Sequence, residues 1–457
     1  MTLRIYNTLS RRVEDFVPLG DPVRLYVCGM TPKFHPHLGH ARCYVGVDLI
    51  RRVLEYRGYQ VRHVQNFTDI DDKTIARAQE EGTTAEEIAR RYTESYFESM
   101  GKLAVQPAHV YPTVTGNMQQ IVQYVEGLIE KGFAYIVGGD VYFEVGRFES
   151  YGRLSGRFED SGMVGVRTEL EPGKRDPKDF ALWKAAKPGE PSWPSPWGEG
   201  RPGWHIECST MVRETLGDQI DIHAGGQDLL FPHHENELAQ SECFTDKEPY
   251  VKYWAHIGLV TMGTEKMAHS TWNFVTLKEM LEKYEPAAVR LYFLRTHYRS
   301  PVMYSEEGIA VAARNLETLR AAYGELSEPI APGAVTSESA SGLLRRFDEQ
   351  LDDDFNSAGA VGVLFDTAHE VNRGGPQTTV LRSAFRKMVE VLGLPLEAEK
   401  ERGASDAAPF IELLIDVRTK LRAQGQWALA DQVRDGLKQL GIVLKDNQQG
   451  TTWEHHD

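Results

Sequence analysis

Two histidines, separated by a leucine and a glycine, stand between a predicted strand and a predicted helix. They are His37 and His40, with Gly39 between them. The first turn of a helix has free backbone N–H groups and the positive end of the helix dipole, and both attract phosphate. Imidazoles three residues apart lie on one side of that turn, and a glycine there lets a ring or a phosphate approach the backbone. The motif therefore predicts a phosphate site, although two surface histidines at a helix start give the same pattern.

Sulfur, imidazole and carboxylate groups from three segments could together form a metal site. These groups are Cys28, Cys208, His233 and Glu237. If Pro232 stands near the first position of a helix, His233 and Glu237 share one face, because residues four apart do so. Two thiolates, an imidazole and a carboxylate suit tetrahedral zinc. The spacing is not that of a zinc finger, a buried cysteine is often only a small core residue, and His234 is a competing ligand, so the pattern alone leaves the metal open.

Two further segments carry charged groups whose meaning depends on their neighbours. Lys266 and His269 lie in a stretch of small and polar residues, and by themselves they indicate only a solvated loop. Asp69, Asp71 and Asp72 follow the second predicted strand. Three carboxylates there fit either a metal site or the N-cap region of a helix, and we favour the cap.

The elements that must position these residues follow from hydrophobic periodicity. A buried strand at 24–28 stops at a glycine, a helix spans 37–56, and alternation predicts a strand at 60–65. Strand, helix and strand in this order form a βαβ unit, which indicates an α/β fold with a parallel sheet. Along the remaining chain we expect, in order, mostly helix at 74–135, a strand-rich insertion at 137–200, helix after Pro232 and at 277–296, a linker at 327–342, amphipathic helix at 343–395 and a polar break at 397–408.

The composition is that of an ordinary globular chain of 457 residues with a net charge of −15. A hydrophobic fraction of 41% excludes wholesale disorder, and we expect neither a membrane span nor a secretory signal. The four cysteines contain no CxxC pair, which favours a reducing cytoplasm over a disulfide scaffold. The acidity argues against a nucleic-acid partner, yet residues 1–65 hold ten Arg and Lys against five Asp and Glu, a local charge of +5 that suits an anionic substrate.

Taken together, the motifs resemble those of the cysteinyl-tRNA synthetases, a family of class I aminoacyl-tRNA synthetases. The resemblance extends in order over essentially the whole chain, so motifs that are weak individually become jointly specific. The matching segments are 26–29, 37–40, 66–73, 193–197, 203–208, 228–237, 266–270, 298–300, 351–356, 427–431 and 450–453.

The resemblance implies a domain organisation. A Rossmann-type catalytic domain with a parallel sheet is expected at 1–326, with a connective insertion at about 110–200 and a stem-contact region at about 247–326. A helical tRNA-binding bundle is expected at 343–397, followed by a small C-terminal anticodon-binding unit at 409–457.

The resemblance also implies an activity, that of a cysteine–tRNA ligase. Such an enzyme activates L-cysteine with ATP and transfers the cysteinyl group to the 3′ end of tRNA(Cys), and the family implies a cytoplasmic monomer with no membrane partner. One zinc per chain is expected to take the substrate thiolate, because zinc prefers soft sulfur to a hydroxyl, whereas shape alone separates cysteine from serine poorly. Mg²⁺ is expected to accompany ATP.

Residue roles carry over from the matched motifs. Zinc is assigned to Cys28, Cys208, His233 and Glu237. The catalytic and ATP-binding residues are expected to be His37, His40, Lys266 and His269, with Gly39 also at the nucleotide. The substrate cysteine is expected to meet Cys28, Thr68, Trp204 and His233.

The chain departs from the family pattern in the second signature loop and beside the first. The loop usually reads Lys-Met-Ser-Lys-Ser and here reads Lys-Met-Ala-His-Ser, with His269 in place of the second lysine. Residues 30–34 read Met-Thr-Pro-Lys-Phe instead of the more usual Pro-Thr-Val-Tyr-Asp. Residues 111–118 lack the Pro-Arg-Ala-Thr-Glu-like stretch of the family.

Two alternatives to a charging synthetase fit part of this pattern. A cysteine ligase of the mycothiol type, which joins cysteine to glucosaminyl-inositol, shares the zinc set, both signatures and the adenylate chemistry. Lys73 and the segment 411–453 favour the synthetase, because those ligases lack the anticodon-reading region. The second alternative, motivated by Ala268-His269, is a synthetase-like paralogue that binds tRNA or cysteine without charging.

Replacing His269 by lysine is expected to raise the rate of cysteine-dependent ATP–pyrophosphate exchange. A lysine is charged at pH 7 whereas an unperturbed histidine is mostly neutral, and one cationic contact in the transition state is worth ~2–3 kcal/mol, the scale of a lost oxyanion donor. For the same reason activation by the native chain should be favoured toward lower pH. An exchange rate that does not change in the variant would show that Lys266 alone suffices.

Overall fold

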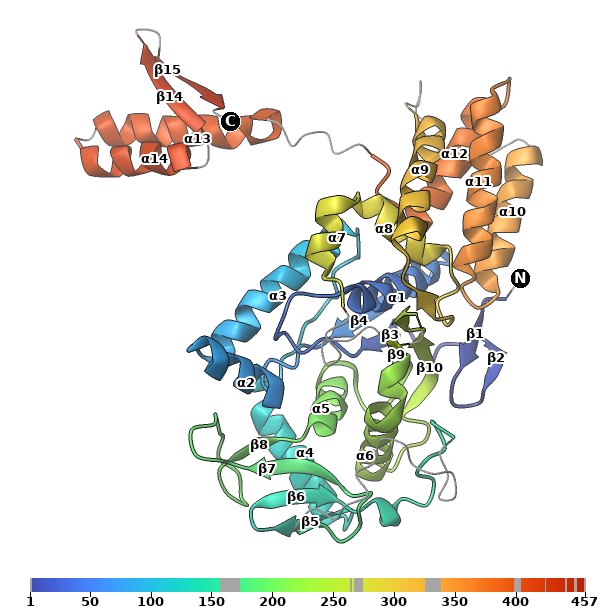
Figure 1. Cartoon of the computed structure of the whole chain (residues 1–457), viewed down its shortest axis with the longest axis vertical. Helices are drawn as coiled ribbons and strands as arrows, with labels where there is room; N and C mark the ends of the chain where they lie inside the picture. Colours follow the sequence, from blue (N-terminus) through green and yellow to red (C-terminus); the bar gives the residue numbers. More distant parts are fainter. Residues whose placement is uncertain are drawn as a thin grey trace. The chain divides into compact units, whose positions relative to one another are not determined.

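A parallel sheet of four strands organises the N-terminal part of the chain (Figure 1). Its strands are β3 (Val23–Val27), β4 (Val61–Gln65), β9 (Ile220–Gly226) and β10 (Val251–Ile257), in the spatial order β10-β9-β3-β4. Every neighbouring pair runs parallel, and the strands are buried over most of their length, as apolar runs predict for a sheet covered on both faces. The predicted α/β class and parallel sheet are confirmed.

The chain divides into two compact units, residues 1–396 and residues 397–457. The computed structural model describes residues 2–156, 173–263, 265–266, 274–324, 338–397, 404–423, 425–439, 442–447 and 450–455. Among these residues no helix combines the length and the apolarity needed to cross a membrane.

Helix α1 (Leu38–Tyr56) connects β3 to β4, as the periodicity of 37–56 predicts. After β4 come three further helices, and then an antiparallel sheet in the order β5-β6-β7-β8. Their bounds are α2 (Asp72–Glu81), α3 (Ala85–Lys102), α4 (Met118–Glu130), β5 (Ala134–Val137), β6 (Asp140–Phe143), β7 (Phe180–Ala185) and β8 (Gly200–Pro202). The helical stretch expected at 74–135 is thus three separate helices, and its last residues already belong to β5.

Helices α5 (Trp204–Leu216) and α6 (Glu235–Thr245) flank β9 in the chain. The helix expected after Pro232 is present as α6, but it begins at Glu235, so Pro232 does not stand at its first position. Residues 230–234 form a single π-type turn in which Phe231 is extended, with φ −139° and ψ 132°. The residue before a proline is pushed out of the α region, which delays the regular helix.

The same effect divides the helix expected at 277–296. Helix α7 (Leu277–Lys283) ends, Glu285 is extended with ψ 141°, and a new helix, α8 (Pro286–Leu294), begins with the proline in its first turn.

The helical segment expected at 343–395 consists of three helices. The first of them, α10, already begins at Glu338, within the predicted linker at 327–342. Residues 327–337 of that linker lie outside the described residues. The bundle consists of α9 (Glu306–Tyr323), α10 (Glu338–Asp352), α11 (Ser357–Arg373) and α12 (Thr378–Leu392).

Short strands complete the first unit. These are the hairpin of β1 (Arg4–Asn7) with β2 (Arg12–Asp15), and a small sheet of β11 (Val260–Met262), β12 (Glu265–Lys266) and β13 (Val302–Met303). The second unit pairs helices α13 (Ala404–Ala423) and α14 (Trp427–Gln439) with a hairpin of β14 (Ile442–Asn447) and β15 (Gly450–His455). Because α13 begins at Ala404, the polar break predicted at 397–408 is shorter than expected. Ile411, Ile415, Leu437 and Ile442 form the apolar core of this unit.

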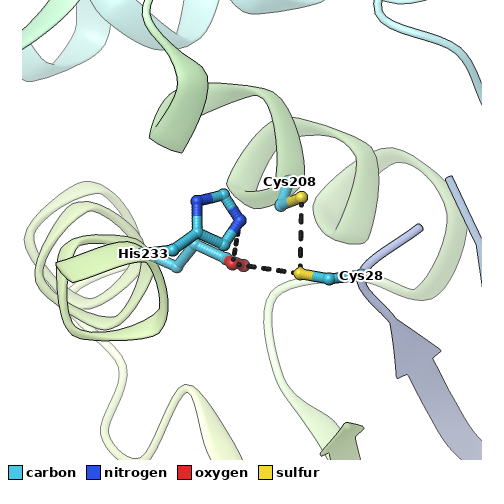
Figure 2. A group of neighbouring side chains, drawn as sticks. Cys28, Cys208 and His233 are labelled. Carbon is cyan, nitrogen blue, oxygen red and sulfur yellow. Dashed lines mark hydrogen bonds and ion pairs between the residues drawn. The ribbon is translucent and has the colours of Figure 1, made fainter. Parts of the chain in front are cut away.

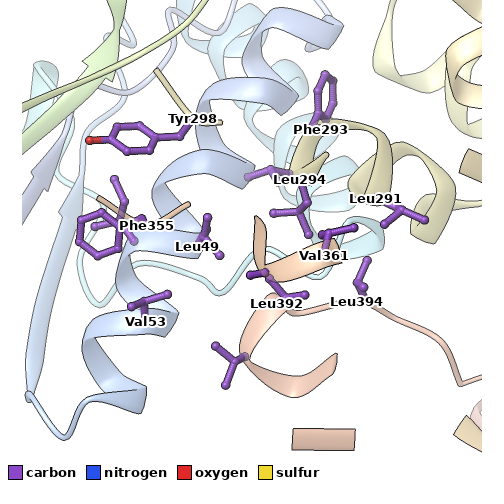
Figure 3. Close-up of a cluster of buried hydrophobic side chains, with 14 of the residues drawn as sticks. Leu49, Val53, Leu291, Phe293, Leu294, Tyr298, Phe355, Val361, Leu392 and Leu394 are labelled. Carbon is purple, nitrogen blue, oxygen red and sulfur yellow. The ribbon is translucent and has the colours of Figure 1, made fainter. Parts of the chain in front are cut away.

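One continuous apolar core joins helix α1 to the helical bundle (Figure 3). Leu49 and Val53 of α1 are fully buried in the same cluster as Leu291 of α8, Val361 of α11 and Leu392 of α12. The bundle is therefore packed on the helix that connects the first two strands of the sheet.

A buried ion pair sits inside this junction. The Arg290 guanidinium donates from Nη2 to Asp48 Oδ2 at 2.5 Å, from Nε to the Leu392 carbonyl at 2.9 Å and from Nη1 to the Leu103 carbonyl at 2.9 Å. Arg52 also donates to Asp48 Oδ2 at 2.7 Å. Burial raises the pKa of Asp48, but the two guanidinium groups outweigh burial and hold that pKa below its ordinary value.

Replacing Asp48 by asparagine is expected to lower the free energy of unfolding by ~3–5 kcal/mol, because the change leaves the buried Arg290 charge without a counter-charge. The measurement is urea denaturation at pH 7, where the stabilisation is fully present; it is lost as the pH falls through the lowered pKa of Asp48. Asp366→Asn is the matched control, since Asp366 pairs with Arg346 at the surface and both side chains are 53% exposed. Its loss should stay below ~1 kcal/mol, and equal losses in the two variants would contradict the prediction.

Candidate active site and metal centre

Four side chains from distant segments converge beside the end of the first central strand (Figure 2). Cys28 follows β3 directly, Cys208 lies on α5, His233 lies in the turn before α6, and Glu237 lies on α6. Their candidate ligand atoms all lie within 4.8 Å of one another, and all four residues are buried. The structure thus brings together the four residues that the sequence assigned to zinc.

The spacing of this group fits a tetrahedral metal ion. Two zinc–sulfur bonds of ~2.3 Å at a tetrahedral angle place the sulfurs ~3.8 Å apart, and the Sγ atoms of Cys28 and Cys208 are 3.7 Å apart. His233 Nε2 lies 3.0 Å from Glu237 Oε1, which in turn lies 3.5 Å from Cys28 Sγ. Although the helix starts late, the π-type turn still points His233 toward Glu237.

A second group of potential ligands shares two of these residues. Cys28 and Glu237 also lie close to His223 and His234, and these four atoms again fall within 4.8 Å. His234 Nε2 is 3.3 Å from Cys28 Sγ, while its Nδ1 contacts His256 Nε2 at 2.8 Å. The set with two sulfurs suits zinc better than the set with one. If the two-sulfur set holds the metal, His223 orients the Glu237 carboxylate through its other oxygen, because His223 Nε2 lies 2.9 Å from Glu237 Oε2.

Protonation in this buried cluster is uneven. Burial raises the pKa of Cys28 well above its usual value, whereas the hydrogen bond with Cys28 lowers the pKa of Cys208 to about 6 against the effect of burial. Burial also opposes the charge on Glu237, but His223 and His233 outweigh it and hold that pKa well below its ordinary range. Without metal the two sulfurs therefore share a proton, which a bound cation would displace.

A cavity of about 320 Å³ adjoins the cluster. Its lining includes Cys28, Gly29, Met30, Thr31, Lys33, Phe34, His37, Gly39, His40, Lys73, Trp204, Asp228 and the backbone segment 257–260. Cys28 belongs both to the metal cluster and to the cavity wall. A ligand in the cavity can therefore reach the metal cluster.

The predicted cysteine-binding residues divide into two pairs. Cys28 and Trp204 line the cavity, and the Trp204 ring stacks on His233 with centroids 4.3 Å apart. Thr68 and His233 are buried and do not line it. The Thr68 hydroxyl donates to Glu207 Oε2 at 3.1 Å. Glu207 was missed by sequence reasoning although it stands beside Cys208, because a lone glutamate in a predicted helix carries no signal of burial.

The two signature histidines cap helix α1. His37 is the N-cap residue, and its Nδ1 accepts from the Gly39 N–H at 3.0 Å. His40 Nδ1 accepts from the His37 N–H at 3.2 Å, and the two rings stack with centroids 3.9 Å apart. Since each Nδ1 accepts a hydrogen bond, each neutral imidazole carries its proton on Nε2. The caps thus fix both tautomers as Nε2–H donors at the helix N-terminus.

The second signature loop is attached next to this N-terminus. Lys266 closes β12, which pairs antiparallel with β11, and β11 begins at the cavity-lining Val260. After the loop, the Leu38 N–H donates to the Val275 carbonyl at 3.2 Å and the Leu277 N–H to the Pro36 carbonyl at 2.7 Å. His269 lies outside the described residues. Both ends of the loop are therefore held near His37.

The three carboxylates after β4 are structural. Asp71 is the N-cap of α2, and its Oδ1 accepts from the N–H groups of Lys73 and Thr74 at 2.8 and 2.7 Å. Asp69 accepts from the N–H of Thr115 at 3.0 Å. Asp72 pairs with Lys184 at 2.9 Å and also with Arg201. The cap interpretation was correct for Asp71, and each carboxylate has protein partners.

Comparison with known proteins agrees with this arrangement. Residues 16–314 match the family described as tRNA synthetases class I (C) catalytic domain, and residues 346–397 match the DALR domain. The sheet, the histidine-capped helix and the adjoining cavity are those of a class I aminoacyl-tRNA synthetase.

Curated relatives narrow the class to one family. A cysteine–tRNA ligase of Dehalococcoides mccartyi is 47% identical over 456 residues, and one of Thermococcus onnurineus is 48% identical over 473 residues, each alignment covering 99% of both chains. The chain belongs to the cysteine–tRNA ligase family.

Solved structures share the fold at low sequence identity. The methionyl-tRNA synthetase of Mycobacterium tuberculosis in complex with methionyl-adenylate is 15% identical, with a TM-score of 0.56 over 82% of this chain and 90% of that one. A leucyl-tRNA synthetase of Agrobacterium radiobacter gives a TM-score of 0.57 at 12% identity, over 84% and 85% of the two chains. These likenesses concern the fold alone.

Cys208→Ser is expected to weaken zinc binding by more than the ~10–100-fold loss expected for His223→Ala, which removes only a residue that orients Glu237. Metal content after dialysis, measured by mass spectrometry, should be about one zinc per chain in the native protein and in the control Cys243→Ser, whose buried thiol lies outside the cluster. Retention of zinc by Cys208→Ser together with its loss from His234→Ala would assign the ion to the second group instead.

Proposed function

We propose that the chain is a cysteine–tRNA ligase, which forms cysteinyl-adenylate from L-cysteine and ATP and then charges tRNA(Cys). The observation that carries the proposal is the position of Cys28, which belongs both to the buried Cys-Cys-His-Glu cluster and to the cavity beside the histidine-capped helix. A site of this kind places a group that binds sulfur next to a group that binds phosphate. Membership of the cysteine–tRNA ligase family supports the same assignment.

Selection of cysteine is proposed to occur at the metal cluster. Cysteine and serine differ by one atom, and a pocket that reads only shape separates such pairs poorly. Zinc bound by Cys28, Cys208, His233 and Glu237 would supply a soft Lewis acid that prefers a thiolate to a hydroxyl. The stacked Trp204 ring covers His233 and leaves Cys28 facing the cavity.

Activation is proposed to rely on position and charge. The cysteine carboxylate attacks the α-phosphorus of ATP; the new P–O bond forms as the bond to the bridging oxygen breaks, and pyrophosphate leaves with the electron pair. His37 and His40 donate from Nε2 to the nucleotide, and Gly39 permits close approach. Lys266 and His269 are proposed to contact the phosphates. Mg²⁺ that arrives with ATP would shield the negative charge of the phosphates.

Transfer completes the proposed reaction. A terminal ribose hydroxyl of the tRNA attacks the adenylate carbonyl and loses its proton. The ester bond forms as the bond between the carbonyl carbon and the phosphate oxygen breaks, and AMP leaves with that electron pair. The DALR domain at 346–397 and the C-terminal unit at 409–457 are proposed to bind the tRNA, the latter at the anticodon. We further propose a cytoplasmic monomer, consistent with four unpaired cysteines.

The purified chain is expected to catalyse cysteine-dependent ATP–pyrophosphate exchange and to attach cysteine, but not serine, to tRNA(Cys). Lys266→Ala should lower the exchange rate ~10²–10³-fold, the scale of one lost transition-state contact. Assays run in parallel with tRNA and with glucosaminyl-inositol separate the alternatives. Transfer to the sugar would identify a mycothiol-type ligase, and tRNA binding without exchange would identify a non-charging paralogue.

A further inference from the structure

Two lysines line the proposed nucleotide cavity, and among the described residues neither has an ion-pair partner. Lys33 and Lys73 share the cavity wall with His37, Gly39 and His40. In the part of the chain that the structure describes, neither ammonium group makes an ion pair or a hydrogen bond. Neither lysine was expected at the site from the sequence.

In the part of the chain that the structure describes, the nearby carboxylates form no ion pair with these lysines, and each has other contacts. Asp71 caps α2, and Asp72 pairs with Lys184 and Arg201. Asp69 is held by Thr115. Two lysines therefore face the cavity, against one carboxylate, Asp228, among its lining residues.

The surroundings of Lys33 disfavour the positive charge of its ammonium group. Lys33 is half-buried, and burial, together with the charge of Lys73, lowers its pKa, while only Asp71 opposes the shift. Holding two like charges together costs free energy that an anion between them would recover. The cavity thus has the electrostatics of a site for a multiply charged anion.

Lys33 stands on a wall whose backbone is fixed by packing. The adjacent Phe34 ring stacks on Tyr92 at 5.8 Å and packs edge-on against Phe274 at 5.7 Å. Four residues after Lys33, His37 caps α1. The backbone that carries Lys33 is therefore held beside the cavity by its neighbours.

We propose that Lys33, with Lys73 beside it, binds the β- and γ-phosphates of ATP and the pyrophosphate formed from them. In the sequence, this lysine stands where the family pattern has tyrosine, and the same chain lacks the second lysine of the signature loop at His269. Lys33 thereby supplies a cation that the loop no longer carries. The assignment rests on the proposed function, since it takes ATP as the nucleotide.

The test compares Lys33→Gln and Lys33→Tyr with the native full-length chain in ATP–pyrophosphate exchange. Both variants should raise KM for ATP and for pyrophosphate roughly ten- to hundredfold, the scale of one charge-assisted hydrogen bond, while Lys33→Arg stays close to native. KM for cysteine and zinc content should not change. Because the contact is fixed and present in the ground state, KM should move more than kcat.

Lys247→Gln is the matched control, since it removes a lysine charge that pairs with Asp218 ahead of β10, at the end of that strand opposite the cavity-lining segment 257–260. Unchanged KM values for ATP and pyrophosphate in both Lys33 variants would overturn the proposal. A rise confined to KM for cysteine or for tRNA would also overturn it, because Lys33 would then bind the amino-acid carboxylate or the tRNA end.

The proposed function can fail separately from this inference. If the native chain shows no cysteine-dependent exchange, calorimetric titration with pyrophosphate still compares native protein with Lys33→Gln. Weaker binding by the variant, at an unchanged melting temperature, would support the phosphate site in the absence of catalysis, and equal binding would reject it.

Discussion

The parallel pairing of β3 with β4 and β9 is the constraint on which the site depends. Parallel strands end at the same edge of a sheet, so Cys28 after β3, Asn66 after β4 and Gly226 at the end of β9 meet there. Gly29 makes the approach possible, because a Cβ at this position would lie 1.4 Å from the Asn66 carbonyl oxygen. Its N–H instead donates to Asn66 Oδ1 at 2.8 Å. A hydrogen bond thus joins the ends of β3 and β4 next to Cys28, which belongs to both the metal cluster and the cavity wall.

Prediction from the sequence was most successful for the βαβ unit and for the group of four candidate metal ligands. The βαβ unit follows from periodicity alone, and the resemblance named Cys28, Cys208, His233 and Glu237 as one group, which the structure brings within ligand distance. The exact helix start was not predictable from the apolar pattern, because the extended Phe231 reflects a proline effect that periodicity does not register. The network of Asp48 and Arg290 joins residues 242 positions apart, so no local pattern contains it.

Charge illustrates how a global property can conceal a local one. The chain carries −15 overall, which by itself argues against an RNA partner. Around the cavity, however, Asp71 accepts hydrogen bonds from the backbone, Asp72 pairs with other cations, and Lys33 and Lys73 make no ion pair among the described residues. The charges that a ligand meets depend on which side chains the fold brings together, since the partners of Asp69 and Asp72 come from residues 46 to 129 positions away.

Helix α1 serves two regions at once. Its first turn carries the paired imidazoles, and its later turns bear Asp48, Leu49 and Val53, which are buried against the bundle. Each residue of a helix turns the chain by ~100°. Loss or gain of one residue between His40 and Asp48 would rotate one region relative to the other, so either the caps or the apolar contacts would be lost. Over evolutionary time this segment should accept substitutions but exclude insertions and deletions, so the number of residues between His40 and Asp48 should stay constant.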